Sequence, residues 1–399
     1  MTATHLLRDR RVLAVLVMMA AISVLSACGG SDGGSAGATT DSPPTDSVPA
    51  ASGPRAAVED DRLHGAPLTE LPARIQMLAD TGAAVTRVGV WWRDIAPTPP
   101  ADPADPADPA YDFSRYDLII RELASHGVSA LVSVYNAPEW AAGSFTPGIN
   151  DQVNAQAPDP DAFGAFMGAL ATRYSGSFEA DGAALPTVDL FEIWNEGNLA
   201  GFLFPQTEKG ERVVLDTYAN MTRAAYDQIK DANPEATVIA GVTGPRGKSN
   251  ERNTGVEDWI AGLADRDVPM DAYSQHVYPV AAPAVETEAF PAWATIDRLT
   301  RAVDRLGGDL PIYITEAGYT TMVTPFRDAG ATATEAEQAQ YVREIYSLPQ
   351  LQTGRFPLVV WFNLQDNPGW PAGLIDINGR KKPSHAAFLD VAKGAAAPG

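Results

Sequence analysis

The 399-residue sequence contains a single cysteine, Cys28, so no disulfide can form within one chain and the stability of the fold must come from packing. Basic residues are also few, with 29 Lys and Arg against 50 Asp and Glu, a formal net charge of −21 at pH 7. Such an excess of negative charge argues against nucleic acid and anionic lipid headgroups as binding partners. It is compatible with solubility and with a neutral substrate.

Several catalytic signatures are missing as well. The sequence has no Gly-x-Ser-x-Gly segment, which excludes the usual nucleophile elbow of serine hydrolases. Its His, Asp and Glu residues show no spacing typical of a metal-ligand set. We therefore expect no catalytic metal and no cofactor.

The N-terminus has the pattern of a secretory signal. Three arginines at positions 8–11 precede an apolar run, Val12–Val24, and small residues follow in Leu25-Ser26-Ala27-Cys28. This ending resembles the bacterial lipobox, which implies that residues 1–27 are removed and that Cys28 carries lipid. The alternative is an uncleaved membrane anchor, but the apolar run is shorter than the roughly 20 residues needed to span a bilayer. We expect an extracytoplasmic protein whose only attachment to the cell membrane is the lipid on Cys28.

Residues 28–57 contain mostly Gly, Ser, Thr, Ala, Asp and Pro without hydrophobic periodicity, which predicts a flexible linker. From residue 58 to residue 399, apolar β-favouring runs alternate with segments of helical spacing. Strands are predicted at 84–92, 128–135, 187–195, 236–242, 270–278, 311–315 and 358–363, and helices at 68–80, 116–125, 161–174, 211–233, 256–263, 292–306, 335–348 and 384–392.

This alternation predicts an α/β fold, a single (β/α)₈ TIM barrel over residues 58–399. An eighth strand is required at the start, and residues 58–66 are its only candidate despite their poor β-propensity. A doubly wound open sheet is the competing fold. It would place a glycine-rich phosphate turn after an early strand, whereas Trp92-Arg93-Asp94-Ile95 stands there.

Three tandem Ala-Asp-Pro triplets occupy residues 101–109. Each proline removes a backbone donor and restricts the residue before it, so the triplets cannot form a helix. We expect an exposed, semi-extended insertion without a functional role.

Two predicted strands end in a glutamate. The run Leu190-Phe191-Glu192-Ile193 leads to Trp194-Asn195-Glu196, and Pro311–Thr315 leads to Glu316. Either glutamate alone is equally compatible with a solvated loop. In a parallel barrel, however, the carboxyl ends of the strands converge, and two carboxylates from different strands are the groups required for glycoside hydrolysis.

Glu192 does not belong to this pair. It lies four residues before Glu196 on one strand, roughly 13 Å away, which is too far for a catalytic pair of carboxylates. We expect Glu192 to be a hydrogen-bonded polar residue inside the barrel. Further polar and aromatic residues near the strand ends fit a sugar, which has apolar faces and a rim of hydroxyls; these residues are Arg87, Trp92, Asn195, His276, Tyr278 and Trp361.

Over residues 84–388 the sequence resembles the clan A glycoside hydrolases, and Phe-Glu-Ile-Trp-Asn-Glu-Gly-Asn-Leu at 191–199 is most similar to glycoside hydrolase family 39. The resemblance implies that Glu196 is the acid/base and Glu316 the nucleophile. It also implies that Asn195 binds the sugar 2-hydroxyl, that Tyr278 bonds the nucleophile and that Trp361 forms the floor of the first subsite. Arg87 and His276 match further polar positions around the nucleophile. The family usually has proline where this chain has Gly197, and we expect the glycine to loosen the loop after the acid/base.

The sequence therefore predicts a retaining glycoside hydrolase that cleaves a β-linked sugar, a β-xyloside or a related polysaccharide, by a two-glutamate mechanism. One alternative is an endo-β-glucanase or polysaccharide hydrolase of the same clan. Another is a non-catalytic, surface-tethered carbohydrate-binding protein on the same barrel. The sugar, the linkage and the oligomeric state stay open.

Overall fold

The computed structural model describes residues 53–142, 155–325 and 331–395. The predicted signal peptide, the predicted lipid attachment at Cys28 and the predicted linker as far as residue 52 lie outside the described residues. A search of the described ranges finds no helix with the length and apolar character needed to cross a membrane.

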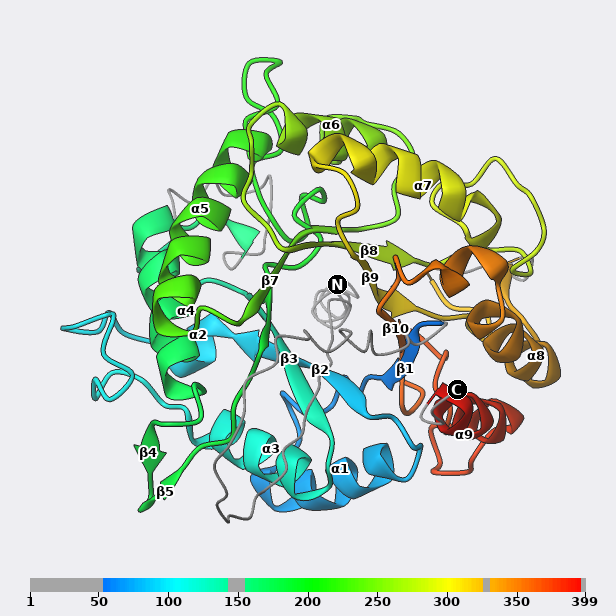
Figure 1. The fold of residues 1–399 in the computed structure, drawn as a ribbon, viewed down its shortest axis with the longest axis horizontal. Coiled ribbons are helices and arrows are strands. Elements are labelled where there is room, and N and C mark those ends of the chain that lie inside the picture. Colours follow the sequence, from blue (N-terminus) through cyan, green and yellow to red (C-terminus); the bar gives the residue numbers. More distant parts are fainter. Residues whose placement is uncertain (1–52, 143–154, 326–330, 396–399) are drawn as a thin grey trace, which may run out of the picture.

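Eight parallel strands close into a barrel at the centre of the molecule, in the order β1-β10-β9-β8-β7-β6-β3-β2 (Figure 1). The barrel strands are β1 (Arg55–Val58), β2 (Val85–Trp91), β3 (Ser129–Tyr135), β6 (Leu190–Ile193), β7 (Thr237–Thr243), β8 (Ala272–Val277), β9 (Ile312–Ala317) and β10 (Leu358–Trp361). The predicted (β/α)₈ fold is confirmed.

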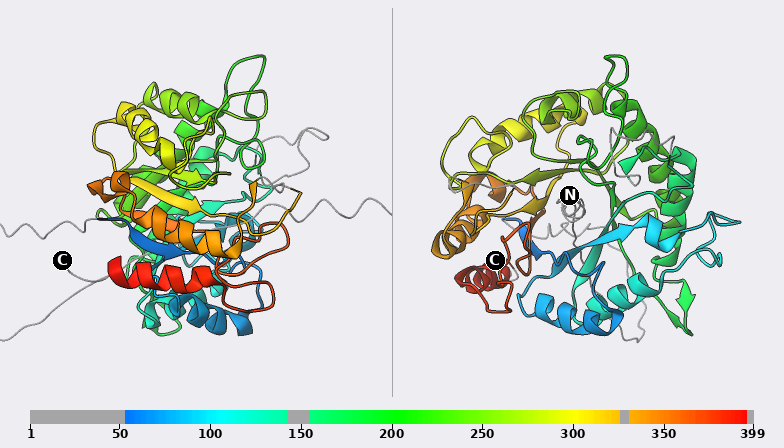
Figure 2. Two further views of the ribbon diagram at one scale, coloured as in Figure 1. Left: turned by 90° about the vertical axis from the view of Figure 1, so that its right-hand side faces the viewer. Right: turned by 180° about the vertical axis from the view of Figure 1, so that it is seen from behind.

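Helices surround the strands on the outside of the barrel (Figures 1 and 2). They are α1 (Leu71–Ala79), α2 (Trp92–Ile95), α3 (Ser114–Ser125), α4 (Pro160–Arg173), α5 (Val214–Ala232), α6 (Val256–Ala264), α7 (Ile296–Val303), α8 (Glu335–Tyr346) and α9 (Pro383–Ala395). A small antiparallel hairpin, β4 (Glu179–Ala180) and β5 (Ala183–Ala184), lies outside the barrel. Every helix and strand predicted from residue 68 onward is present, and only the element ends differ.

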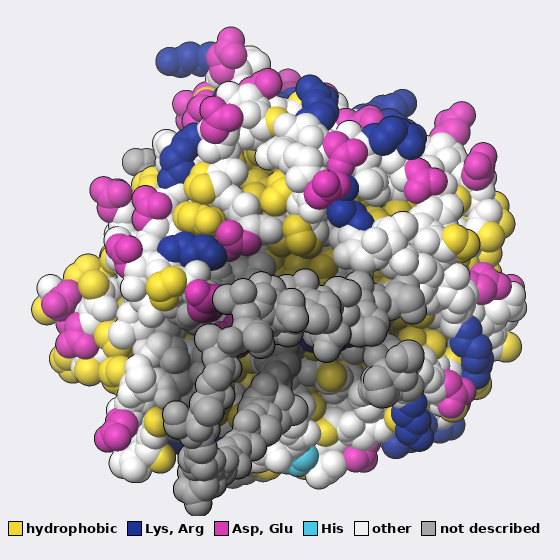
Figure 3. Space-filling model, in the orientation of Figure 1, with side chains coloured by type: hydrophobic (Ala, Val, Ile, Leu, Met, Phe, Trp, Pro, Cys, Tyr) yellow, Lys and Arg dark blue, Asp and Glu magenta, His cyan; other side chains and the backbone are white. Residues whose placement is uncertain are grey.

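Most of the barrel strands are rich in apolar residues because both of their faces are covered. All seven residues of β3 are buried, as are all six of β8 and of β9. One face points to the barrel interior and the other packs under the helices, as in all-parallel sheets generally. On the face drawn in Figure 3, the described acidic and basic side chains are interspersed over the surface, with no gathering of one sign.

The first strand does not lie where the sequence predicted it. It spans Arg55–Val58 instead of residues 58–66, and it takes in residues assigned to the linker. Ala56 and Ala57 have low β-propensity, but β1 pairs with β10 over four residues and meets β2 at Ala57 and Val85. Pairing on both sides overrides the weak local preference.

The Ala-Asp-Pro insertion is also different from the prediction, because it is a compact series of turns. Asp102, Asp105 and Asp108 each accept a hydrogen bond on the side chain from the backbone N–H two residues later. The N–H groups of Asp105 and Asp108 donate to the carbonyl oxygens three residues earlier. Asp108 also accepts from the N–H groups of residues 101 and 102, at 2.9 and 2.8 Å. Each triplet thus forms its own side-chain-supported turn, which the proline restriction alone does not reveal.

A buried ion pair fixes the segment that follows β1. Asp60 accepts two hydrogen bonds from the Arg74 guanidinium of α1, at 2.6 and 2.7 Å. The Asp60 side chain has no exposed surface and that of Arg74 is 10% exposed. The pair ties helix α1 to the mouth of the barrel next to the end of β1.

Replacing Arg74 should therefore be costly. We expect Arg74→Met to lower the free energy of unfolding by about 3 kcal/mol, because it leaves the Asp60 carboxylate buried without its partner. Chemical denaturation measures this loss. The double variant Asp60→Leu/Arg74→Met is the control and should recover part of it; equal stability of the single variant and the wild-type protein would show that the pair does not fix the segment.

Candidate active site

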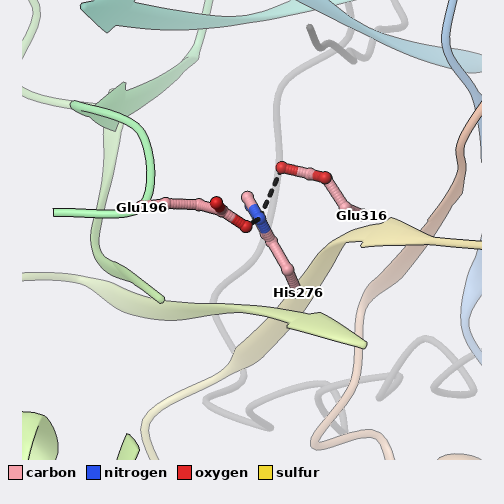
Figure 4. Close-up of side chains that lie close together, drawn as sticks. All are labelled: Glu196, His276 and Glu316. Atoms are coloured by element: carbon pink, nitrogen blue, oxygen red, sulfur yellow. Dashed lines mark hydrogen bonds and ion pairs between the residues drawn. The ribbon is translucent and has the colours of Figure 1, made fainter. Parts of the chain in front are cut away.

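Glu196 and Glu316 come together at one end of the barrel, although 120 positions separate them in the sequence. Glu196 follows β6 and Glu316 lies in β9, and they are 9% and 5% exposed. Together with His276 of β8 they form a cluster in which one oxygen of each carboxyl group and a ring nitrogen lie within 4.8 Å of one another. Figure 4 shows the three side chains pointing toward a common centre.

His276 connects the two carboxyl groups. Its Nδ1 lies 2.8 Å from Oε1 of Glu196 and also forms an ion-pair contact with Oε1 of Glu316 (Figure 4). Burial lowers the pKa of His276, against the hydrogen bond with Glu196, which raises it. The lowered pKa favours the neutral imidazole, and Nδ1 links the two carboxyl groups.

Arg87 of β2 supplies the positive charge beside the nucleophile candidate. Its Nε donates to Glu192 at 2.6 Å, and its Nη1 donates to Oε1 of Glu316 at 3.4 Å. Its Nη2 donates to Oδ1 of Asn195 at 3.2 Å. Arg87 is 1% exposed, so its positive charge acts on the site from within the barrel and its hydrogen bonds orient the side chains there.

Glu192 is the hydrogen-bonded interior residue that the sequence predicted. It has no exposed surface, and in addition to Arg87 it accepts a hydrogen bond from the Ser274 hydroxyl at 2.8 Å. Ser274 in turn contacts the Thr315 hydroxyl at 2.6 Å. Ser274 and Thr315 were not singled out from the sequence, because buried hydroxyl residues in strands give no distinctive signal.

Tyr278 donates a short hydrogen bond from its hydroxyl to Oε2 of Glu316, the oxygen that does not face Arg87 and His276. Both predicted neighbours of the nucleophile candidate, Arg87 and Tyr278, therefore contact it. Both lower the pKa of Glu316.

The net shift of the Glu316 pKa is nevertheless upward. Burial outweighs Arg87 and Tyr278 and raises the pKa of Glu316 from 4.5 to about 8. The sequence identifies Arg87 and Tyr278 as neighbours of Glu316, but it does not show the loss of water around a side chain inside the barrel mouth.

Burial also raises the pKa of Glu196. The hydrogen bond from His276 opposes this shift, and repulsion from Glu316 adds to it. The pKa of Glu196 is thus shifted upward, as suits a general acid. Burial contributes more to this shift than the neighbouring Glu316 does.

The backbone that presents Glu196 adopts a rarely populated conformation. Trp194 has φ of 66° and Glu196 has φ of 38°, both in the left-handed region that side chains other than glycine seldom occupy. Neighbouring contacts hold it there: the indole N–H of Trp194 donates to the carbonyl of Phe202 at 2.8 Å, and Asn198 bonds the backbone of Gly244 and Thr254.

Gly197 does not loosen this loop, contrary to the expectation. It is buried, and a Cβ atom built there would lie 2.9 Å from the Tyr218 ring and 3.2 Å from Trp259. Its carbonyl accepts a hydrogen bond from the Gln206 side chain at 2.9 Å. Glycine is therefore the residue that the packing of this chain requires.

Two of the predicted sugar-binding tryptophans are interior residues. Trp92 has no exposed surface and stacks on Phe166, with ring centroids 5.3 Å apart. Trp361 is also fully buried, and its indole N–H donates to the carbonyl of Ala372 at 2.9 Å. Neither offers a ring face to a ligand in this structure, because both face the packed aromatic and loop residues behind the site.

A different tryptophan lies beside the site. Trp370 is partly exposed and packs edge-on against Tyr278, with ring centroids 4.9 Å apart. Phe362, directly after β10, contacts the same tyrosine at 6.1 Å. Trp370 thus provides a partly exposed aromatic surface beside Tyr278, whereas Phe362 is buried like Trp361.

Glu196, His276 and Glu316 also satisfy the spacing of a three-ligand metal site, which sequence spacing could not reveal because each residue comes from a different strand. The same nitrogen of His276 makes the hydrogen bond to Glu196. Metal binding and this hydrogen bond are therefore alternatives.

No protein family model and no curated protein matches the sequence. The fold is similar to that of solved glycoside hydrolases. A family 39 glycoside hydrolase from Bacteroides cellulosilyticus WH2 matches with a TM-score of 0.56 and 18% identity over 87% of this chain, which spans 65% of that protein's length. A monomeric β-xylosidase from Caulobacter crescentus CB15 matches with a TM-score of 0.54 and 20% identity over 84% of this chain and 68% of its own.

A third similar structure is GH5_18 from Streptomyces cattleya in complex with GlcNAc, with a TM-score of 0.58 and 13% identity over 87% of this chain and 81% of that one. At such identities the similarity concerns the fold. The chain thus has a barrel fold similar to those of these solved glycoside hydrolases, with two glutamates and a histidine meeting at its mouth.

Proposed function

We propose that the protein is a retaining glycoside hydrolase acting on a β-linked sugar, a β-xyloside or a related saccharide, with Glu316 as nucleophile and Glu196 as acid/base. The observation that carries the proposal is the approach of the two carboxyl groups, because one oxygen of Glu196 and one of Glu316 lie within 4.8 Å of each other. Retaining enzymes place these groups about 5–5.5 Å apart and inverting enzymes about 6.5–9.5 Å apart. The separation here favours the retaining reaction.

In the first step, a carboxylate oxygen of Glu316 attacks the anomeric carbon while the Glu196 carboxyl gives its proton to the departing glycosidic oxygen. The alcohol leaves, and a glycosyl ester remains on Glu316. In the second step, Glu196 takes a proton from water, which attacks the anomeric carbon and releases Glu316 as carboxylate. Protons and bonds balance over the two steps.

The contacts around the two glutamates support this division of roles. Glu316 receives hydrogen bonds from Arg87 and Tyr278, which stabilise a carboxylate. Glu196 contacts only the neutral His276 among the described ionisable groups within hydrogen-bond distance. When Glu316 becomes an ester its negative charge disappears, so the pKa of Glu196 falls and Glu196 can act as base.

Labelling with an activated 2-deoxy-2-fluoro β-glycoside tests the proposal directly. The fluorine slows both steps by destabilising the cationic transition state, and the activated leaving group lets the glycosyl ester accumulate. We expect a mass increase of one fluorosugar on the peptide that contains Glu316, with loss of labelling in Glu316→Gln. Labelling that persists in this variant would assign the nucleophile elsewhere. A parallel screen of aryl β-xyloside, β-glucoside and β-galactoside identifies the sugar.

The pH dependence should reflect the burial of Glu316. Because burial raises its pKa to about 8 and the nucleophile must be ionised, we expect kcat/KM to rise through the neutral range instead of near pH 4.5. Ionising this buried group also opposes folding, so the melting temperature should fall as pH rises from 4.5 toward 8. In Glu316→Gln this part of the fall in melting temperature should be absent. An acidic limb of kcat/KM near pH 4.5 would contradict the buried environment assigned to Glu316.

Glu196→Gln should separate acid catalysis from nucleophilic attack. A glutamine cannot protonate the leaving group, so we expect a loss of 10²- to 10⁴-fold on alkyl glycosides and saccharides, which have poor leaving groups. Aryl glycosides with acidic phenols need little protonation and should lose far less in the first step. Steady-state and single-turnover rates on both substrate types measure the difference, and equal losses would argue against Glu196 as the acid. Glu139→Gln, at an exposed position after β3, is the control.

A further inference from the structure

A third carboxyl group lies in the same barrel mouth. Glu59 directly follows β1, where its N–H donates to the carbonyl of Trp361 and its carbonyl accepts from Leu364. These two backbone bonds fix Glu59 against the end of β10. The side chain has no exposed surface.

Neither oxygen of this carboxyl group has a hydrogen-bond partner among the described residues. The other acidic groups nearby are different: Asp60 is bound by Arg74, and Glu192 is bound by Arg87 and Ser274. Glu59 is the only carboxyl group in the described parts of the chain with both oxygens buried and unpartnered. A buried polar group of this kind destabilises the free protein, so its presence calls for a partner that arrives from outside.

Its surroundings are those of the nucleophile candidate. The charges that act on Glu59 include Arg87 and Glu316, and burial raises its pKa well above 4.5. Glu59 in turn acts on the hydroxyl of Tyr278, which bonds Glu316. The side chain therefore lies within the electrostatic reach of the reacting groups.

The order of the strands shows which part of a ligand Glu59 would meet. Going round the barrel from β6 through β7, β8, β9 and β10 to β1, Glu196 comes first, Glu316 follows and Glu59 is last. A sugar whose anomeric carbon lies between Glu196 and Glu316 has its leaving group toward Glu196. In-line attack places the leaving group and Glu316 on opposite faces of the anomeric carbon, so the ring extends to one side of the line between the two glutamates. Because the barrel is closed, β10, β1, β2 and β3 form the wider of the two sides, and Glu59 lies on that side.

We propose that Glu59 binds a pair of hydroxyls on the far side of the sugar ring, with one hydroxyl on each carboxyl oxygen. This proposal rests on the proposed function, because it places the ring by the two catalytic glutamates. Hydroxyls are the partners that a sugar offers to a buried carboxyl group, and a bidentate contact would also orient the ring over Glu316. Glu59 is thereby assigned as a substrate-binding residue that determines specificity for ring hydroxyls.

The first measurement concerns the free protein. Glu59→Met replaces the carboxyl group by an apolar side chain of similar length, and we expect its melting temperature to exceed that of the wild-type protein by about 2 °C or more. The matched control is Asp366→Asn, which removes a buried carboxylate that Lys382 binds at 2.7 Å and should lower the melting temperature. A lower melting temperature for both Glu59→Met and Glu59→Gln would overturn the proposal, because it would make Glu59 a structural residue.

The second measurement concerns the ring hydroxyls. On an aryl β-glycoside that the wild-type enzyme hydrolyses, Glu59→Gln and Glu59→Met should lose about 100-fold in kcat/KM, since two hydrogen bonds to a carboxyl group are weakened or removed. On the 3-deoxy and 4-deoxy analogues the loss should shrink, because the hydroxyl that Glu59 binds is already missing. Equal losses on the parent and on both deoxy substrates would contradict the assignment.

A binding measurement distinguishes failure of the Glu59 site from failure of the proposed hydrolysis. If the wild-type protein hydrolyses no glycoside, thermal shifts with xylose, glucose and galactose replace the kinetics. A sugar that stabilises the wild-type protein but not Glu59→Met supports the site without the reaction, and equal stabilisation of both overturns the site. If none of the three sugars shifts either protein, the proposed function and the Glu59 site are both rejected.

Discussion

One buried guanidinium governs the chemistry of the barrel mouth. Arg87 lies among the carboxyl groups of Glu192 and Glu316 and acts on that of Glu59, and it is 1% exposed. A single positive charge cannot keep several buried carboxyl groups ionised together, because each additional anion is repelled by the others and is deprived of water. Burial accordingly raises the pKa of Glu59, and it raises that of Glu316 to about 8.

The remaining contacts decide where the charge and the proton reside. Arg87 donates most closely to Glu192, which faces the barrel interior and also has Ser274 as a donor. Glu316 receives a longer bond from Arg87 and a short one from Tyr278, while Glu196 contacts only His276. The number of donors thus falls from Glu192 to Glu196. Hydrogen bonds to a carboxylate favour its ionised form, but burial raises the pKa of both Glu316 and Glu196 in spite of these contacts.

The sequence predicted most of the fold because the parallel barrel depends on a strong local pattern. Seven strands are apolar runs ended by polar or glycine residues, and each is followed by a segment of helical spacing. The exception, β1, shows the limit of this reasoning. Arg55–Val58 contains two alanines and only four residues, and its strand conformation comes from pairing with β10 and β2. Those partners lie at positions 358–361 and 85, so local propensity does not reveal them.

Most of the residues singled out from the sequence come together in the structure, and those that do not have a common cause. Glu196, Glu316, Arg87, Asn195, His276 and Tyr278 meet because strand ends converge whatever their separation in sequence. Trp92 and Trp361 were assigned by residue type, but both are fully buried. The depth of a side chain below the barrel rim decides whether it meets a ligand, and depth depends on where each strand ends relative to its neighbours.

The same dependence explains why Glu59 was overlooked. With the first strand assigned to residues 58–66, Glu59 was an interior position of a poor strand, whereas the structure places it just after the strand ends. There it follows the same rule as Glu196: an apolar run ends, and the next polar side chain lies in the barrel mouth. A chain under selection for stability alone would have no reason to keep a carboxyl group at that depth without a partner. Its electrostatic interaction with Arg87 and Glu316 supports the proposal that Glu59 meets a ligand in the barrel mouth.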